Sequence, residues 1–97
     1  MLHLIFQSPI EHSVLQRIES GDDVVFFENA VFRLIKGTIL SSELQQMLNN
    51  NVHLWVLSAE LDTRGIQINK LIQGVEVIDF VGVVKLTEKN KVIRTWS

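Results

Sequence analysis

The segment that most constrains the fold is an apolar run, residues 52–57, which leads directly into a short helix signal. The run reads VHLWVL, and residues 58–65 read SAELDTRG. An apolar run without alternation is typical of a strand that is covered on both faces of a parallel sheet. Ser58 can cap the following helix, and Gly65 can end it. The segment therefore predicts a buried strand that turns into a helix at its carboxyl end, where open α/β sheets place their working surfaces.

The same succession of strand and helix signals continues along the whole chain. Strands are expected at residues 2–6, 24–27, 52–57, 75–78 and 92–96. Helices are expected from Ser8-Pro9 to a stop at Ser20-Gly21, and at residues 43–49, 58–65 and 80–89. Residues 30–35 fit a short helix or an irregular turn, and residues 66–71 fit either a loop or a short helix. This alternation predicts one α/β domain over residues 1–97, with a mostly parallel sheet of four to five strands and helices on both faces.

Polar residues at the ends of the predicted strands fit helix caps. Ser8, followed by Pro9 and by Glu11 as a capping-box partner, predicts the start of the first helix. Caps are also expected at Asn29, at Ser41 or Ser42, at Ser58 and at Asp79. An alternative for Ser8 or Ser58 is a small-anion site at the helix N-terminus, in a binding module of flavodoxin-like form.

Composition excludes several classes of function. The chain of 97 residues has no cysteine, so disulfides, thiolate metal sites and cysteine chemistry are excluded. Its net charge of −2 and the lack of a Lys/Arg cluster disfavour direct binding of nucleic acid. Hydrophobic residues make up 46% of the chain, which favours a sheet covered on both faces or a surface that docks on a partner.

No segment of the sequence predicts export or membrane insertion. The apolar start, residues 1–6, is too short for a signal peptide and lacks a basic region before it. No run approaches the roughly 20 apolar residues that a bilayer-spanning helix needs. We therefore expect a cytoplasmic protein that is not attached to a membrane.

No cluster of residues predicts a catalytic, metal or cofactor site. His3 and His53 lie near the amino ends of predicted strands, and His12 lies on the outer face of the first helix, so the three histidines do not converge. The glycines are isolated, and no phosphate-binding loop is present. Glu60 and Arg64 are four residues apart and can pair on a helix face. The alternative for Arg64 is an exposed guanidinium that meets a partner's carboxylate or phosphate.

Several short stretches, in order, resemble the TusB/DsrH family of small sulfur-relay proteins. They span nearly the whole chain and comprise residues 1–3, Ser8-Pro9, Gly21-Asp22, residues 28–31, residues 57–65, residues 78–80, residues 84–87 and Trp96. The resemblance implies a DsrE/DsrF/DsrH-like fold of three layers. It also implies a heterohexamer with two copies each of B-, C- and D-type subunits. In that complex a partner subunit carries the persulfide cysteine. Sulfur would pass toward 2-thiolation of the tRNA wobble uridine.

The missing cysteine bears on which branch of that family the chain resembles. The DsrH proteins of sulfur oxidisers typically carry a cysteine, and this chain has Ser20 and Gly21 in the loop where we would look for it. The resemblance thus favours a non-catalytic, TusB-like subunit without a cofactor, with TusC-like and TusD-like partners. A DsrH-like component of a sulfur-oxidation complex is the alternative.

The last helix and the C-terminal segment indicate where such partners would bind. Apolar residues at 80, 81, 83, 84 and 86 point in several directions on a helix, so one sheet cannot cover them all. We expect part of this surface to meet another subunit, or a second copy when the chain is alone. The candidate interface or family-signature residues are Ser8, Glu60, Asp62, Arg64, Gly65, Asp79, Val81, Val84 and Trp96.

Overall fold

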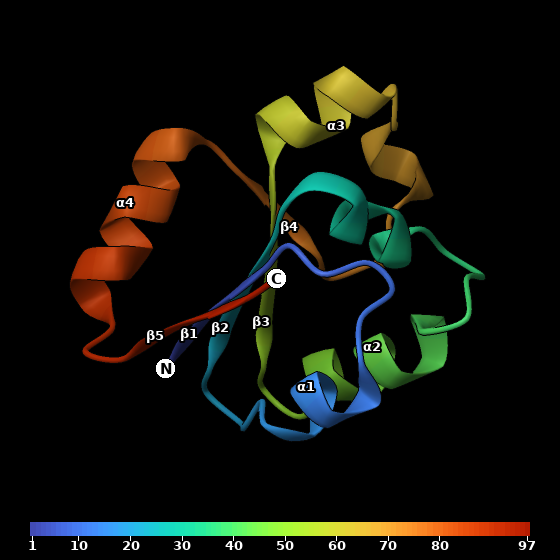
Figure 1. Ribbon diagram of the computed structural model, residues 1–97. Coiled ribbons are helices and arrows are strands. Elements are labelled where there is room, and N and C mark those ends of the chain that lie inside the picture. Colours follow the sequence, from blue (N-terminus) through green and yellow to red (C-terminus); the bar gives the residue numbers. More distant parts are fainter.

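The computed structural model describes residues 1–97 and contains a five-stranded sheet (Figure 1). Its strands are β1 (Leu2–Ile5), β2 (Asp23–Phe26), β3 (His53–Leu57), β4 (Glu76–Ile78) and β5 (Ile93–Trp96). They lie in the order β4-β3-β2-β1-β5, and every neighbouring pair is parallel. The predicted α/β fold is confirmed, including the C-terminal strand.

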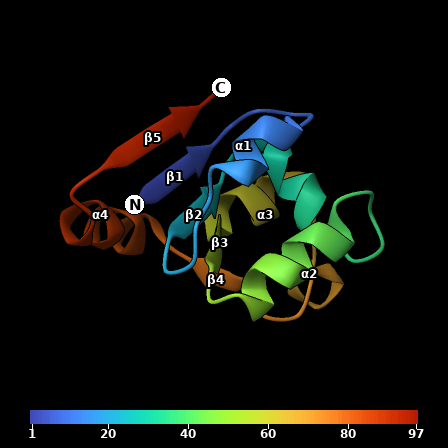
Figure 2. The ribbon, with the colours of Figure 1, turned by 90° about the horizontal axis from the view of Figure 1, so that it is seen from below.

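The strand order determines which face each helix covers. The helices are α1 (His12–Gln16), α2 (Ser41–Asn49), α3 (Ser58–Arg64) and α4 (Phe80–Lys89), with 3₁₀ helices η1 (Glu28–Leu34) and η2 (Ile68–Lys70). From β1 to β4 the chain crosses the sheet in one direction, and it returns from β4 to the opposite edge as β5. Because such crossovers are right-handed, the return places α4 on the opposite face from α1, α2 and α3. Figure 2 shows α4 alone on its face.

Each face of the sheet has its own apolar core. The larger core joins α1, η1, α2 and α3 to one face of the sheet and includes the fully buried Phe26, Leu34 and Leu44. The smaller core lies under α4 and consists of Leu2, Val25, Ile78, Val83 and Leu86. The expected burial on both faces is therefore confirmed, but it is unequal.

Helix α4 covers only part of its face. A helix of its 10 residues is roughly 15 Å long and about 10 Å wide, whereas five strands at ~4.8 Å spacing extend over about 19 Å. Leu4, Phe27, Trp55 and Leu57 pack against the smaller core and stay only partly buried.

None of the helices combines the length and apolar character that crossing a bilayer requires.

Most of the predicted helix caps are wrong. Only Asp79 caps as predicted, with its carboxylate oxygen accepting from the amide of Gly82 at 2.8 Å. Helices α2 and α3 begin at Ser41 and Ser58 themselves, so these serines occupy the first helical turn and make no capping hydrogen bond. Gly65 does end α3 in the left-handed region, at φ 64°.

The start of the first helix also differs from the prediction. Helix α1 begins at His12, and no side chain caps it, so the proposed Ser8 cap and its Glu11 partner are wrong. The side chain of Gln7 takes part instead, because its oxygen accepts from the Glu11 amide at 2.8 Å. The helix also ends at Gln16, before the stop expected at Ser20-Gly21.

Candidate functional site

The carboxyl edge of the sheet brings several predicted residues together. Arg64 Nη1 donates to Glu60 Oε1 at 3.1 Å, and Arg64 Nε donates to Asn29 Oδ1 at 3.3 Å. The other oxygen of Glu60 accepts from the backbone amide of Glu28, which has a positive φ of 52°. This cluster ties α3 to η1, and the helix-face pairing of Glu60 with Arg64 is confirmed.

The alternative for Arg64, an exposed guanidinium, does not match its surroundings. Its side chain is 18% exposed, and two of its nitrogens, Nε and Nη1, are hydrogen-bonded within the chain. Asp62, by contrast, is exposed on α3, and Ser8 is exposed between β1 and α1. Of these residues, Asp62 and Ser8 present polar groups at the surface, whereas Glu60 and Arg64 are bonded to each other at the edge of the sheet.

Beside this edge lies an apolar surface that the chain itself leaves open. We call it the α4 face and define it by Phe27, Leu57, Phe80, Val81 and Val84. Phe80 is 71% exposed, Val81 61% and Val84 41%, and Asp79 fixes the start of this helix. Val83 and Leu86 of the same helix are buried against the sheet. The prediction that one sheet cannot cover all of these apolar residues is confirmed.

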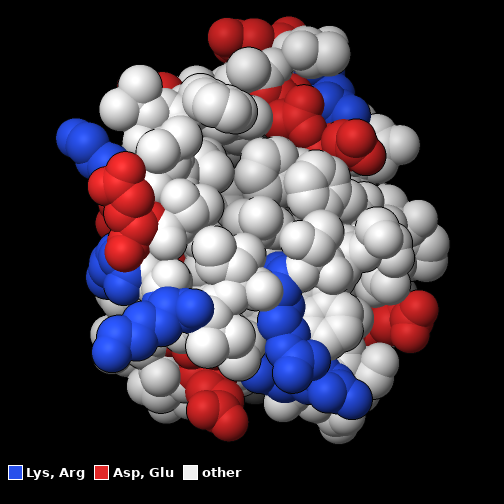
Figure 3. Space-filling model, turned by 60° about the vertical axis from the view of Figure 1, so that its left-hand side comes forward, with Lys and Arg blue, Asp and Glu red and all other residues white.

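Figure 3 turns the side with α4 toward the viewer. Uncharged side chains fill the upper and middle parts of this view, acidic side chains stand toward its margins, and basic side chains extend from the lower part toward the middle. Phe6 adds to the apolar area, because its ring stacks on that of Phe27 with centroids 4.5 Å apart. An apolar centre with a charged rim is the usual anatomy of a protein–protein interface.

The opposite, amino edge of the sheet contains a buried polar network. His3 is completely buried, and its two ring nitrogens lie 3.1 Å from Trp96 Nε1 and 2.9 Å from Asp22 Oδ2. Since the indole N–H donates, His3 Nδ1 accepts, and Nε2 carries the proton that is donated to Asp22. The side chain of Trp96 is therefore bonded inside the chain, and it links β5 to β1.

Asp23 forms a second network, which fastens α4 to the sheet. Its carboxylate accepts from Trp55 Nε1 at 3.1 Å, from Asn90 Nδ2 at 3.1 Å and from Lys89 Nζ at 3.3 Å. Burial alone would raise the pKa of Asp23, but these donors outweigh it and hold the pKa below its usual value. Burial likewise opposes a low pKa at Asp22, where hydrogen bonds from the Glu19 amide, His3 and the N-terminal amine lower it.

These carboxylates predict a loss of stability in acid. A carboxylate with a lowered pKa in the folded state stabilises the fold above its unfolded pKa of about 3.9, and that contribution is lost as the pH falls through the folded-state pKa. We expect the free energy of unfolding, measured with urea, to fall steeply below about pH 4. Asp22→Asn and Asp23→Asn should each make this loss shallower. Asp62→Asn, at an exposed site, should keep the wild-type slope, and an unchanged slope in all three would contradict the assignment.

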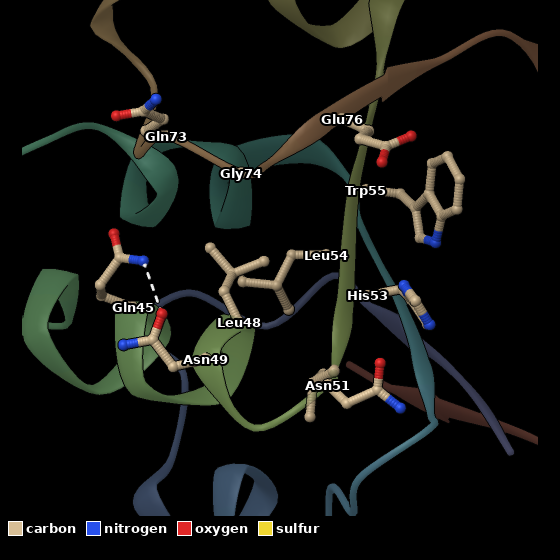
Figure 4. Close-up of a pocket in the computed structure, with 11 residues that line it drawn as sticks. Gln45, Leu48, Asn49, Asn51, His53, Leu54, Trp55, Gln73, Gly74 and Glu76 are labelled. Carbon is tan, nitrogen blue, oxygen red and sulfur yellow. Dashed lines mark hydrogen bonds between the residues drawn. The ribbon is translucent and has the colours of Figure 1, made fainter.

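A cavity of about 320 Å³ lies beside the amino half of β3 (Figure 4). Four carboxamides line it, and one pair is joined by a hydrogen bond from Gln45 Nε2 to Asn49 Oδ1 at 3.4 Å. His53, Trp55 and Glu76 point away from the apolar residues Leu48 and Leu54, on the other side of the strand (Figure 4). This cavity was not predictable from the sequence, because its lining residues come from two segments, 45–55 and 73–76, that only the fold brings together. The cavity offers hydrogen-bonding groups but no activated nucleophile.

The three histidines lie in three different surroundings. His3 belongs to the buried network, the exposed His12 lies 3.6 Å from a Glu43 oxygen, and His53 borders the cavity of Figure 4. No group of three or more His, Asp or Glu side chains is placed to hold a metal ion.

Comparison with known proteins agrees with this fold. The family model for DsrH-like proteins matches residues 6–93. The chain belongs to the DsrH-like family. It is similar to two curated relatives named Protein TusB: one from Erwinia tasmaniensis at 25% identity and one from Serratia proteamaculans at 27%, each alignment covering 99% of this chain and 100% of the relative. The family resemblance inferred from the sequence is therefore confirmed.

Two solved structures share the fold of this DsrH-like chain. One is a protein of unknown function from Methanobacterium thermoautotrophicum, with a TM-score of 0.79 over 97% of this chain and 95% of that one. The other is the ychN protein of E. coli, with a TM-score of 0.79 over 98% of this chain and 97% of that one. Both are 18% identical to this chain, so they show the fold alone.

Proposed function

We propose that this DsrH-like chain is a non-catalytic subunit of a sulfur-relay complex that serves 2-thiolation of the tRNA wobble uridine. Family membership supports a sulfur-relay role in general terms. The name of the two curated relatives, Protein TusB, favours the tRNA branch over a sulfur-oxidation complex. The proposed complex contains TusC-like and TusD-like subunits, with two copies of each of the three chains.

The observation that carries this proposal is the exposed α4 face. Phe80, Val81 and Val84 stand on a helix whose other side is already packed on the sheet, so no further folding of this chain would cover them. A partner subunit on this face would bury them next to Phe27 and Leu57. The Glu60–Arg64 cluster and the exposed Asp62 would then lie at the polar rim.

A non-catalytic role is consistent with the groups that this chain possesses. Sulfur relay through persulfides needs a thiolate, and the chain has no cysteine. Its best-connected polar groups, Asp22, Asp23 and His3, have their hydrogen-bonding capacity used inside the fold. In the proposed complex this chain completes the assembly and shapes the surroundings of a partner's cysteine.

The proposal predicts that the chain accepts no sulfur. The purified chain would be incubated with a cysteine desulfurase and radiolabelled cysteine and analysed under non-reducing conditions. We expect no label on this chain, because it offers no thiol to form a persulfide. A Ser20→Cys variant, with the new thiol at an exposed loop position, serves as a matched control for an accessible cysteine. Stoichiometric label on the wild-type chain would contradict the proposed role.

A further inference from the structure

A second cavity, of about 330 Å³, opens between the end of α1 and the amino half of β1 and β5. It is lined by Met1, His3, Gln16, Arg17, Glu19 and Arg94. A water molecule occupies about 30 Å³ of liquid, so the cavity can hold a small polyatomic ion together with several waters. It belongs neither to the α4 face nor to the cavity of Figure 4.

Two arginines stand at this cavity without a carboxylate partner. Arg17 follows α1 and Arg94 lies in β5, and both side chains are exposed. The ion pairs of the chain, at N···O distances up to 4.0 Å, include neither of them. Two unpaired guanidinium groups at one cavity create a positive potential that an anion would relieve.

Both arginines lie near one aromatic ring, that of Trp96. The guanidinium carbons of Arg17 and Arg94 each lie 5.9 Å from the centroid of the Trp96 ring, at cation–π distance. The ring itself is held by its hydrogen bond to the fully buried His3. Trp96 thus restrains both arginines near the cavity, which lowers the entropy cost of ordering them around a ligand.

The acidic groups nearby do not neutralise the two arginines. Asp22 is engaged by His3 and by the N-terminal amine, at 2.9 Å and 3.1 Å. Glu19 lines the cavity but forms no ion pair, and its exposed side chain can turn toward water when an anion enters.

We propose that this cavity binds a phosphate- or sulfate-type oxyanion between Arg17 and Arg94. The planar donor fork of a guanidinium matches the paired oxygens of such an ion. The ion is either free or the phosphate of a mononucleotide, since both present the same group. This site is separate from Ser8 and Ser58, the positions that the sequence suggests for a small anion, and it does not depend on the proposed assembly.

The test follows the indole N–H signals of Trp55 and Trp96 by NMR in the full chain. Sodium sulfate, sodium phosphate and AMP would be titrated at constant ionic strength, with sodium chloride making up the difference. We expect a saturable shift of the Trp96 signal and little change at Trp55. Arg17→Gln and Arg94→Gln should each weaken binding about tenfold or more, because each removes a charge-assisted contact. Lys36→Gln, which removes a positive charge outside the cavity, should bind like the wild type.

The outcomes separate the sources of the ion. Equal affinity for phosphate and AMP would support a free ion, and tighter binding of AMP would support a mononucleotide. A linear shift that does not saturate would overturn the proposal. So would equal weakening by Lys36→Gln, or a response to an RNA with none to the small anions. The Trp96 signal of each arginine variant, recorded without ligand, shows whether the variant has kept the fold.

Discussion

Deleting residues 92–97 is expected to remove most of the stability of the fold. The deletion takes away β5, whose backbone meets β1 through Leu2 N to Val92 O at 3.0 Å and Phe6 N to Trp96 O at 2.9 Å. It also removes Trp96 and leaves the buried His3 without its donor. Loss of a large aromatic side chain from a packed site alone costs about 3–5 kcal/mol, against a typical total of about 5–15 kcal/mol.

Thermal melting followed by circular dichroism measures this effect. Deletion of Ser97 alone is the matched control, because it keeps the β1–β5 pairing and the Trp96–His3 hydrogen bond. We expect a melting temperature close to that of the wild type for the control and a fall of more than ten degrees, or no folded state, for the longer deletion. An unchanged melting temperature together with unchanged association would refute the structural role of β5.

The sequence predicted the sheet better than the helix starts. Unbroken apolar runs such as residues 24–27 and 52–57 identify strands because both faces of the sheet are buried, and nothing local competes with that signal. The residues around Ser8 and Ser58 match the local sequence pattern of a helix cap, but neither serine caps a helix in the structure. In the structure α3 follows β3 without an intervening residue, so Ser58 already lies in the first turn.

The candidate site was predictable only in part. The i, i+4 spacing revealed the Glu60–Arg64 pair, but its contacts to Glu28 and Asn29 join segments more than 30 residues apart along the chain. The two networks at Asp22 and Asp23 were missed for the same reason, since their donors lie in β1, β3 and the end of α4. Apolar residues on several sides of α4 were visible in the sequence, whereas their exposure depends on how far one helix extends over five strands.

Replacing exposed apolar residues of the α4 face is expected to reduce assembly far more than folding. Val81→Glu and Val84→Glu change side chains that are 61% and 41% exposed, so the isolated fold can keep the new carboxylates in water. In an interface the same carboxylates would be buried without partners, which costs several kcal/mol. We expect each substitution to weaken association with the relay partners about tenfold or more, and the double variant to weaken it further.

Two comparisons make this expectation specific. Ile39→Glu introduces the same charge at a residue that is 84% exposed outside the α4 face, and it should assemble like the wild type. Melting curves of the isolated variants should lie within a few degrees of the wild type, because surface substitutions usually change stability by about 0.5 kcal/mol or less. Loss of assembly in Ile39→Glu to the same degree would point to a general charge effect instead.

The most direct measurement is native mass spectrometry of the chain after co-expression with TusC-like and TusD-like partners. The proposed function predicts one complex whose mass corresponds to two copies of each of the three chains, and it predicts that the Val81→Glu/Val84→Glu double variant is depleted from that complex. A chain that sediments as a monomer at high concentration and is recovered without these partners would contradict the proposed role.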